Sequence, residues 1–358
     1  MKNRLFSVLT VLICIVLLTS CSSDVLKTEV ITDELTQTPV IVNSKLENNS
    51  DYNKFLIDFD PGFTIPGLFE GFIPQGICCD EVLDAFIISG YFEDGKYPSM
   101  LCVVDKQSGR LLKSVSLKSV SGEDYTLHAG GIAADNGNIY VVSGYEVNVL
   151  SSSALKSAVN GSAVSFESNF KSITRGSFAS IANNTLYIGD FIESSNSARD
   201  EVENITTLES GETFYAYCEA YILEDGLPAV SKINSSGDGY IPDYMLAVPE
   251  QVQGITVTPA KSFVFSTSYG RRNDSAIKIF DDILNSSRVG SMNIDGNEVD
   301  LYACSADLLN KTYVAPPMSE SLVFDDGYVY MLFESGASKY RNGGGKYSSD
   351  KVFYAKFD

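Results

Sequence analysis

The stretch Ala129-Gly130-Gly131-Ile132 is followed, after the dipeptide Asn136-Gly137, by the apolar run Ile139-Tyr140-Val141-Val142-Ser143-Gly144-Tyr145. A turn of small residues thus leads into a short strand, a hairpin dipeptide and a second strand. Asn-Gly supplies the positive φ angles that tight hairpins need. The stretch therefore predicts a β-hairpin whose first strand starts at a turn of small residues.

The same pattern recurs four more times along the chain. The other turns and their second strands lie at 74–77 with 85–91, 175–178 with 186–191, 252–255 with 263–269, and 319–322 with 328–333. The first unit continues with strand-like runs at 99–105 and 111–117. Each unit therefore holds about four strands, which is the make-up of a propeller blade.

These repeats predict an all-β fold, a β-propeller, and they favour five blades. The longest gap separates the third and fourth units, so six blades, with a degenerate one in that gap, remain the alternative. The run Phe55-Leu56-Ile57-Asp58-Phe59 is predicted to be a strand. It would pair with 352–357 in the last blade, which closes the ring and leaves no free sheet edge there.

The N-terminus has the features of a secretory signal peptide. A basic head, Met1-Lys2-Asn3-Arg4, precedes an apolar run at 5–18. The ending Leu18-Thr19-Ser20-Cys21 resembles the lipobox of bacterial lipoproteins. That resemblance implies cleavage before Cys21 and attachment of a lipid, with palmitate among its acyl chains. The expected organisation is a signal peptide at 1–20, a lipidated cysteine and flexible tether at 21–50, and the propeller at 51–358.

The charge of the chain limits its partners. The formal net charge is −20, and loss of Lys2 and Arg4 with the signal peptide lowers it to −22. A surface this acidic repels nucleic acid and anionic lipid headgroups, so no nucleic-acid partner is expected. The lipid on Cys21 would then hold the protein at the extracytoplasmic face of a cell membrane or envelope.

The turns also carry a family resemblance. The run His128-Ala129-Gly130-Gly131-Ile132, with Pro74-Gln75-Gly76-Ile77 before it and Pro316-Pro317-Met318-Ser319-Glu320 after it, resembles secreted bacterial β-propeller proteins of unassigned activity. More loosely, the units are similar to gluconolactonase-like and streptogramin-lyase-like propellers. The resemblance covers about residues 52–358 and rests on blade repeats. It therefore implies a fold and no particular activity.

The sequence offers little catalytic or metal-binding chemistry. It has a single histidine, His128, and no G-x-S-x-G motif, so no catalytic residue is assigned. The loops at 234–239 and 293–298 contain suitable oxygen atoms for Ca²⁺, but hairpin turns explain them more simply. No cofactor is expected, and Ca²⁺ is kept as an alternative. The cysteines at 78, 79, 102, 218 and 304 are expected to be mostly buried thiols.

Five polar residues at the blade starts form the predicted binding site. They are Gln75, His128, Arg175, Gln253 and Glu320. Because inner strands of a propeller line its central channel, these side chains are expected at the channel mouth. Their mixture of donors and acceptors suits a small polar ligand. The alternative is that they hydrogen-bond only to one another and to water, and so hold the blades in register.

Together these observations predict a lipid-anchored, non-catalytic propeller that binds a small polar ligand or a surface protein. The alternative function is a propeller hydrolase or lactonase with a divalent cation in the central channel. The sequence does not decide whether the protein is an enzyme, although it favours a binding role.

Overall fold

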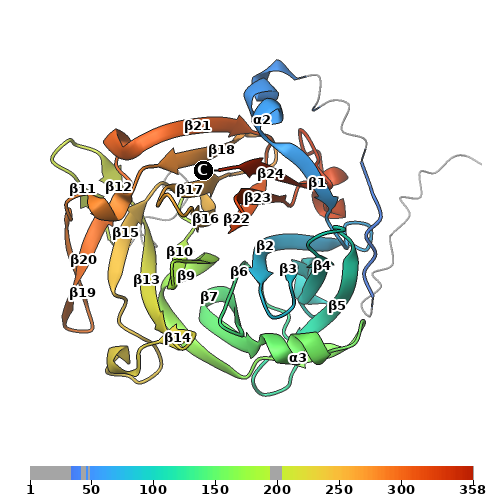
Figure 1. Cartoon of the computed structure of the whole chain (residues 1–358), viewed down its shortest axis with the longest axis horizontal. Coiled ribbons are helices and arrows are strands. Elements are labelled where there is room, and N and C mark those ends of the chain that lie inside the picture. Colours follow the sequence, from blue (N-terminus) through green and yellow to red (C-terminus); the bar gives the residue numbers. More distant parts are fainter. Residues whose placement is uncertain (1–33, 42–45, 47–48, 194–203, 358) are drawn as a thin grey trace, which may run out of the picture.

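The computed structural model describes residues 34–41, 46, 49–193 and 204–357. Cys21 and the predicted signal peptide lie outside these residues. The described chain is a β-propeller (Figure 1). Five innermost strands contact one another in a closed ring, and in ring order they are β2 (Phe72–Asp80), β6 (Gly131–Asp135), β9 (Ser168–Ala182), β16 (Val252–Val257) and β22 (Ser319–Asp325).

The five inner strands correspond, in order, to the five turn-and-strand units of the sequence. Three of the units, the first, fourth and fifth, form regular antiparallel blades. Outward from the inner strand, the first blade holds β3 (Ala85–Phe92), β4 (Met100–Asp105) and β5 (Leu111–Lys118). The fourth holds β17 (Phe263–Thr267), β18 (Ser275–Phe280) and β21 (Leu309–Ala315). The fifth holds β23 (Tyr328–Phe333), β24 (Lys351–Lys356) and β1 (Asp60–Thr64).

The second and third units share one continuous sheet because β9 is long. Its first half pairs with β7 (Asn138–Ser151) and its second half with β10 (Thr185–Asp190). The third unit then continues with β13 (Ala216–Glu224) and β15 (Tyr244–Val248). The gap in which a sixth blade was considered therefore contributes outer strands to this unit.

Two insertions cover the outer edges of neighbouring blades. The strand β8 (Ala163–Ser165) leaves the second unit and pairs in parallel with β5. The hairpin of β19 (Gly290–Ile294) and β20 (Asn297–Ala303) leaves the fourth unit, and β20 pairs in parallel with β15. Both additions occupy hydrogen-bonding groups that a sheet edge would otherwise expose.

The remaining elements are short. The strands are β11 (Thr206–Thr207), β12 (Thr213–Phe214) and β14 (Leu227–Pro228). The α-helices are α2 (Asn53–Asp58), α3 (Ser152–Ser157) and α4 (Ser338–Arg341). Single 3₁₀ turns lie at Ser50–Tyr52, Glu93–Gly95, Val230–Lys232, Ile283–Asn285 and Ala306–Leu308. Within the described residues, no helix is long and apolar enough to cross a membrane.

The ring closes as predicted, but through different residues. The strand β1 pairs with β24, with Asp60 opposite Tyr354. The predicted strand at 55–59 is instead helix α2 followed by Phe59. In a helix, residues i and i+4 share a face while i+2 points away. Phe55 and Phe59 accordingly stack with their ring centroids 4.6 Å apart in the core, whereas Ile57 is 79% exposed.

Residues 34–41, which the sequence assigned to the flexible tether, lie against the propeller. The Gln37 amide donates to the carbonyl oxygens of Thr64, at 2.7 Å, and Gly109, at 2.6 Å. Its own oxygen accepts from the Leu111 backbone N–H at 2.7 Å. This segment therefore connects the closing strand to the first blade.

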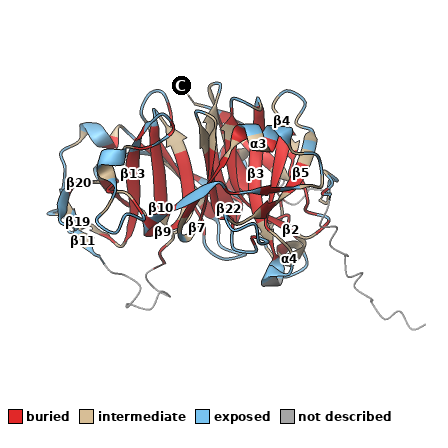
Figure 2. Cartoon of the chain, turned by 90° about the horizontal axis from the view of Figure 1, so that it is seen from below, coloured by how far each residue is buried: buried red, intermediate tan, exposed pale blue. Residues whose placement is uncertain are grey.

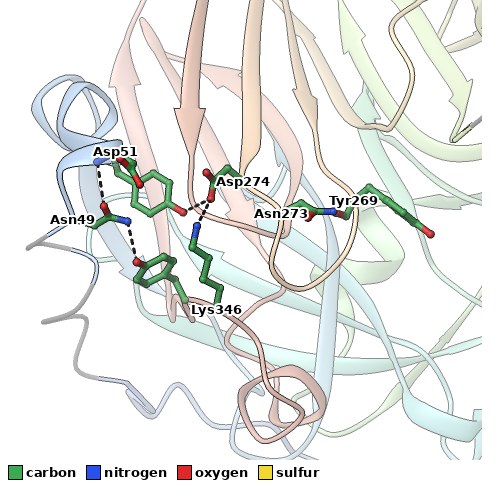
Figure 3. Close-up of polar contacts among 8 residues, drawn as sticks. Asn49, Asp51, Tyr269, Asn273, Asp274 and Lys346 are labelled. Carbon is green, nitrogen blue, oxygen red and sulfur yellow. Dashed lines mark hydrogen bonds and ion pairs between the residues drawn. The ribbon is translucent and has the colours of Figure 1, made fainter. Parts of the chain in front are cut away.

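A second group of contacts holds residues 49–52 against the fourth and fifth blades (Figure 3). The Tyr52 hydroxyl donates to the Asp274 carboxylate at 2.5 Å, and the Lys346 ammonium donates to the same oxygen at 2.9 Å. The Asn49 amide donates to the Tyr347 hydroxyl at 2.9 Å. The segment before the first blade is thus held by polar contacts as well as by aromatic packing.

The cysteine prediction is confirmed. Cys78, Cys102, Cys218 and Cys304 are buried, Cys79 is half-buried, and all five are free thiols. Burial raises the pKa of each of these thiols. They therefore behave as small apolar residues rather than as nucleophiles.

Candidate functional site

A cavity of about 640 Å³ opens at one mouth of the ring. It lies on the face that carries α4, because Tyr340 of that helix lines it, and Figure 2 shows α3 on the opposite face. All five polar residues selected from the sequence line this one cavity, namely Gln75, His128, Arg175, Gln253 and Glu320. Each comes from a different unit of the propeller.

Irregular pairing places three of these side chains. The register between β2 and β3 shifts at Gln75, that between β16 and β17 at Gln253, and that between β22 and β23 over the segment containing Glu320. A bulge adds a residue to one strand and turns its side chain in a new direction. The same device, repeated in three blades, explains why equivalent sequence positions reach one cavity.

A hydrogen-bonded chain connects neighbouring blades at the cavity wall. The Gln75 Nε2 group donates to Glu334 Oε2 at 2.9 Å. Its Oε1 atom is therefore the acceptor side of the amide, and it contacts His128 Nε2. Since that oxygen cannot donate, His128 carries its proton on Nε2. The amide orientation and the histidine tautomer thus determine each other.

Two carboxyl groups that line the cavity meet each other. Glu320 is 3% exposed and Glu334 is 9% exposed, and their side chains are hydrogen-bonded to each other. Burial, followed by the charge of Glu334, raises the pKa of Glu320 well above its usual range. Burial also raises the pKa of Glu334, to about 7, although hydrogen bonds from Tyr340, Glu320 and Gln75 oppose the shift.

The pair is therefore expected to hold at least one proton at neutral pH. Glu334 receives more hydrogen bonds and lies near Lys339, so it is the partner that ionises first. Glu320 stays protonated and acts as a hydrogen-bond donor, which an ordinary carboxylate cannot do.

His128 is a neutral imidazole in this setting. Part of its ring remains accessible from the cavity, but the surrounding protein displaces water and lowers the pKa of His128 to about 4. The nearby charges of Lys339 and Arg175 act in the same direction. The ring also packs against Tyr91, with centroids 4.2 Å apart and planes inclined by 34°.

Arg175 and Gln253 differ from the other predicted site residues. The Arg175 side chain is exposed and Gln253 is half-buried. Within the described part of the chain, the Arg175 guanidinium and the Gln253 amide make no hydrogen bond or ion pair, although both line the cavity. Mutual hydrogen bonding therefore accounts for Gln75, His128 and Glu320, but not for these two.

Sequence reasoning missed Glu334, Tyr340, Ser143 and Phe191 as parts of the cavity wall. Two of them, Glu334 and Phe191, share a signal because each directly follows the second strand of a unit, whereas Ser143 lies within β7. Glu334 directly follows β23, the second strand of the fifth unit. Tyr340 comes from α4 in the loop between β23 and β24, and no repeat of the sequence marks it.

A second cavity, of about 470 Å³, opens at the opposite mouth between the hairpin turns of the inner strands. Its buried carboxylate, Asp80, already has partners: one oxygen accepts from the Leu83 backbone N–H and the other from the Ser152 hydroxyl. Asp325 is paired with Lys106 at 2.6 Å. These polar groups are satisfied within the protein, so this mouth is the weaker candidate.

The loops considered for Ca²⁺ are turns. The loop at 293–298 connects β19 to β20, and the loop at 234–239 contacts it through the Ser235 hydroxyl and the Asp295 carboxylate at 2.5 Å. Among the described residues, no group of three or more His, Cys, Asp or Glu side chains is arranged to hold a metal ion.

Comparisons with known proteins find related folds only. No protein-family model matches the chain, and no curated protein matches it. Among solved structures, a glutaminyl cyclase from Myxococcus xanthus is 10% identical, covers 84% of this chain and 97% of its own, and has a TM-score of 0.42.

Two further structures have the same level of similarity. An aldose sugar dehydrogenase from Streptomyces coelicolor, in its PQQ-bound form, is 10% identical, covers 83% of this chain and 97% of its own, and has a TM-score of 0.44. BamB from Moraxella catarrhalis is 9% identical, covers 83% of this chain and 88% of its own, and has a TM-score of 0.33. Likeness at this level does not extend to activity.

The carboxyl pair should make stability depend on pH. The pKa of Glu334 is about 7 in the folded chain, against 4.5 for a free carboxyl, so the folded state holds its proton more tightly. The contribution of this carboxyl to the free energy of unfolding is therefore fully present below pH 4.5 and is lost as the pH rises through 7. Glu334→Gln should remove that loss, which is worth about 1–3 kcal/mol between pH 5 and 8.

Urea unfolding of both proteins at pH 5 and pH 8 measures this difference. Glu224→Gln, which alters an exposed carboxylate at the end of β13, is the matched control and should follow the wild type. Parallel pH profiles for wild type and Glu334→Gln would show that the pair does not share a proton.

Proposed function

We propose that this protein is a binding module whose central cavity holds a small polar ligand. The observation that carries the proposal is the contrast within the cavity wall. Gln75, His128 and Glu320 form an ordered hydrogen-bonded network, while Arg175 and Gln253 face the same space with no partner in the described chain. Hydrogen-bonded side chains hold the shape of the cavity, and side chains without a partner remain available to a ligand, as expected of a preformed binding site.

The cavity chemistry fits a ligand rich in hydroxyl or amide groups. Arg175 offers donors, and Gln253 offers both a donor and an acceptor. Glu320 donates its one proton to Glu334, so it offers a ligand an acceptor oxygen. Burial raises the pKa of Tyr91 to about 12, so its hydroxyl stays neutral and can donate. Phe191 adds an apolar surface. The volume of about 640 Å³ suits a monosaccharide or a dipeptide.

Isothermal titration calorimetry with a defined panel tests the proposal. The neutral probes are D-glucose, D-galactose, N-acetyl-D-glucosamine and N-acetyl-glycylglycine amide. The carboxylate probes are D-glucuronate, D-galacturonate and N-acetyl-glycylglycine. We expect saturable binding by at least one probe. If none of them binds at millimolar concentration, the proposed function is wrong for this ligand class.

Gln253→Ala should weaken binding of any probe that the wild type binds, by about tenfold, because it removes an amide that has no other hydrogen bond to make. The melting temperature should stay unchanged for the same reason. Gln107→Ala, in an exposed turn between β4 and β5, is the matched control. Binding that survives Gln253→Ala unchanged would exclude this amide from the site.

The three other predicted substitutions should separate by their effect on folding. Gln75→Ala and Glu320→Ala are each expected to abolish binding, whereas Arg175→Ala should weaken binding of the carboxylate probes and spare that of the neutral ones. Gln75→Ala should also destabilise the fold, since it leaves buried Glu334 with one hydrogen bond fewer. Arg175→Ala should not, because that side chain is exposed.

We also propose that the chain is a lipoprotein held at the outer face of a membrane. The support is the basic head, the apolar run and the Leu18-Thr19-Ser20-Cys21 ending. Cys21→Ala should abolish lipid attachment and release the protein from the membrane, or stop its processing, while the propeller still folds. Radiolabelled fatty acid incorporated equally into Cys21→Ala and wild type would refute this proposal.

A further inference from the structure

The cavity is chemically two-sided. In the ring order, β9 contacts β6 and β16, whereas β2 and β22 contact each other on the other side of the channel. Arg175 therefore projects from the side opposite Gln75 and Glu320. One wall presents a cation with the Ser143 and Ser177 hydroxyls, and the other presents the carboxyl network and Tyr340.

The Arg175 guanidinium is open to a ligand. Nine of the cations that the structure describes do form ion pairs, including Lys171 of the same strand, whose ammonium lies 2.8 Å from Glu146. Arg175 forms none within the described residues, its guanidinium makes no hydrogen bond there, and it lines the cavity.

The electrostatics around Arg175 favour an anion over a neutral group. His128 of the adjoining unit feels the charge of Arg175, and it is neutral. Of the two cavity carboxyls, Glu320 is protonated and Glu334 receives three hydrogen bonds and the field of Lys339. Arg271 stacks on Tyr340 at 5.1 Å from the ring centroid, so another cation lies next to a residue that lines the cavity. The cavity is therefore not negative, although the protein as a whole is.

We infer that the ligand carries a carboxylate, which Arg175 binds, and a neutral hydrogen-bonding portion, which reaches Gln75 and Glu320. This inference rests on the proposed function and specifies its ligand class. A guanidinium matches a carboxylate through two parallel hydrogen bonds. A single arginine, with an ionised Glu334 across the cavity, suits the single charge of a carboxylate better than the double charge of a phosphate monoester.

Matched ligand pairs test this inference by calorimetry. The pairs are D-glucuronate with D-glucose, D-galacturonate with D-galactose, and N-acetyl-glycylglycine with its amide. In each pair the two members differ at the carboxylate. We expect the carboxylate member of the pair that binds to have about tenfold higher affinity, and Arg175→Gln to abolish that difference while the affinity for the neutral member stays the same.

Lys171→Gln, on the same strand but paired with Glu146, is the matched control and should keep the preference. Arg175→Lys should keep part of it, since the charge remains but the planar fork is lost. Equal affinity within every pair would overturn this inference and leave the proposed function standing. Tighter binding of D-glucose 6-phosphate than of D-glucuronate would overturn the carboxylate assignment. No binding by any member would overturn the proposed function itself.

Discussion

Deletion of residues 49–64 should prevent the propeller from folding. The segment contains Tyr52, Phe55 and Phe59, which are fully buried, and the strand β1 that completes the fifth blade. Burial of each large aromatic side chain is worth about 1.5–3 kcal/mol, so about 5–9 kcal/mol would be lost. A native domain is stable by only about 5–15 kcal/mol. We therefore expect the deleted protein to lose its cooperative thermal transition.

A pair of point variants tests the same segment without removing it. Phe55→Ala should lower the free energy of unfolding by about 3–5 kcal/mol, because it leaves a cavity among buried aromatic rings. Ile57→Ala, on the same helix but 79% exposed, should change it by less than about 0.5 kcal/mol. Equal losses for both variants in urea unfolding would contradict the helix, since a strand would bury both side chains.

Gly131→Ala should be the most damaging single-methyl change in the ring. A Cβ atom at Gly131 of β6 would lie 2.3 Å from the Ala179 backbone nitrogen and 2.5 Å from the Phe178 carbonyl carbon, both in β9. Backbone atoms of a neighbouring inner strand cannot move aside as a side chain can. Overpacking of this kind costs about 1–3 kcal/mol and sometimes more. We expect at least about 3 kcal/mol.

Thermal unfolding measures this effect as a fall in melting temperature of about 5 °C or more. Gly290→Ala on β19 is the matched control, because a Cβ atom there meets nothing within 4 Å. Gly254→Ala should behave like Gly131→Ala, since its Cβ would lie 2.6 Å from the Ser321 Cα atom of β22. A harmless Gly131→Ala would mean that the inner strands are not in close contact.

The candidate site was predictable because it repeats. Gln75, Gln253 and Glu320 occupy equivalent positions of their units, and equivalent positions of a propeller meet at one end of the channel. That symmetry places residues from distant parts of the chain in one cavity without any knowledge of side-chain contacts. It does not reveal which of them are already hydrogen-bonded, because those partners, Glu334 and Tyr340, lie outside the repeated turn.

The N-terminal segment shows where pattern reading fails. The run Phe55-Leu56-Ile57-Asp58-Phe59 has a large apolar residue at every second position, as a strand can have, and its helix is only six residues long. A helix this short is not stable on its own, so packing decides its conformation. Here the stacked rings of Phe55 and Phe59, one helical turn apart, fit the space beside Phe353 and Tyr313.

The sequence alone was sufficient for the β-propeller fold, the order of its inner strands and the five polar residues of the cavity, because these depend on local turn chemistry repeated along the chain. Tertiary structure decided which groups are satisfied and which are open. It placed Glu320 against Glu334, so that Glu320 keeps its proton and donates a hydrogen bond to Glu334. It also left Arg175 facing the cavity across from them. Protonation and pairing depend on burial and on neighbours from other blades, and no local pattern of residues contains that information.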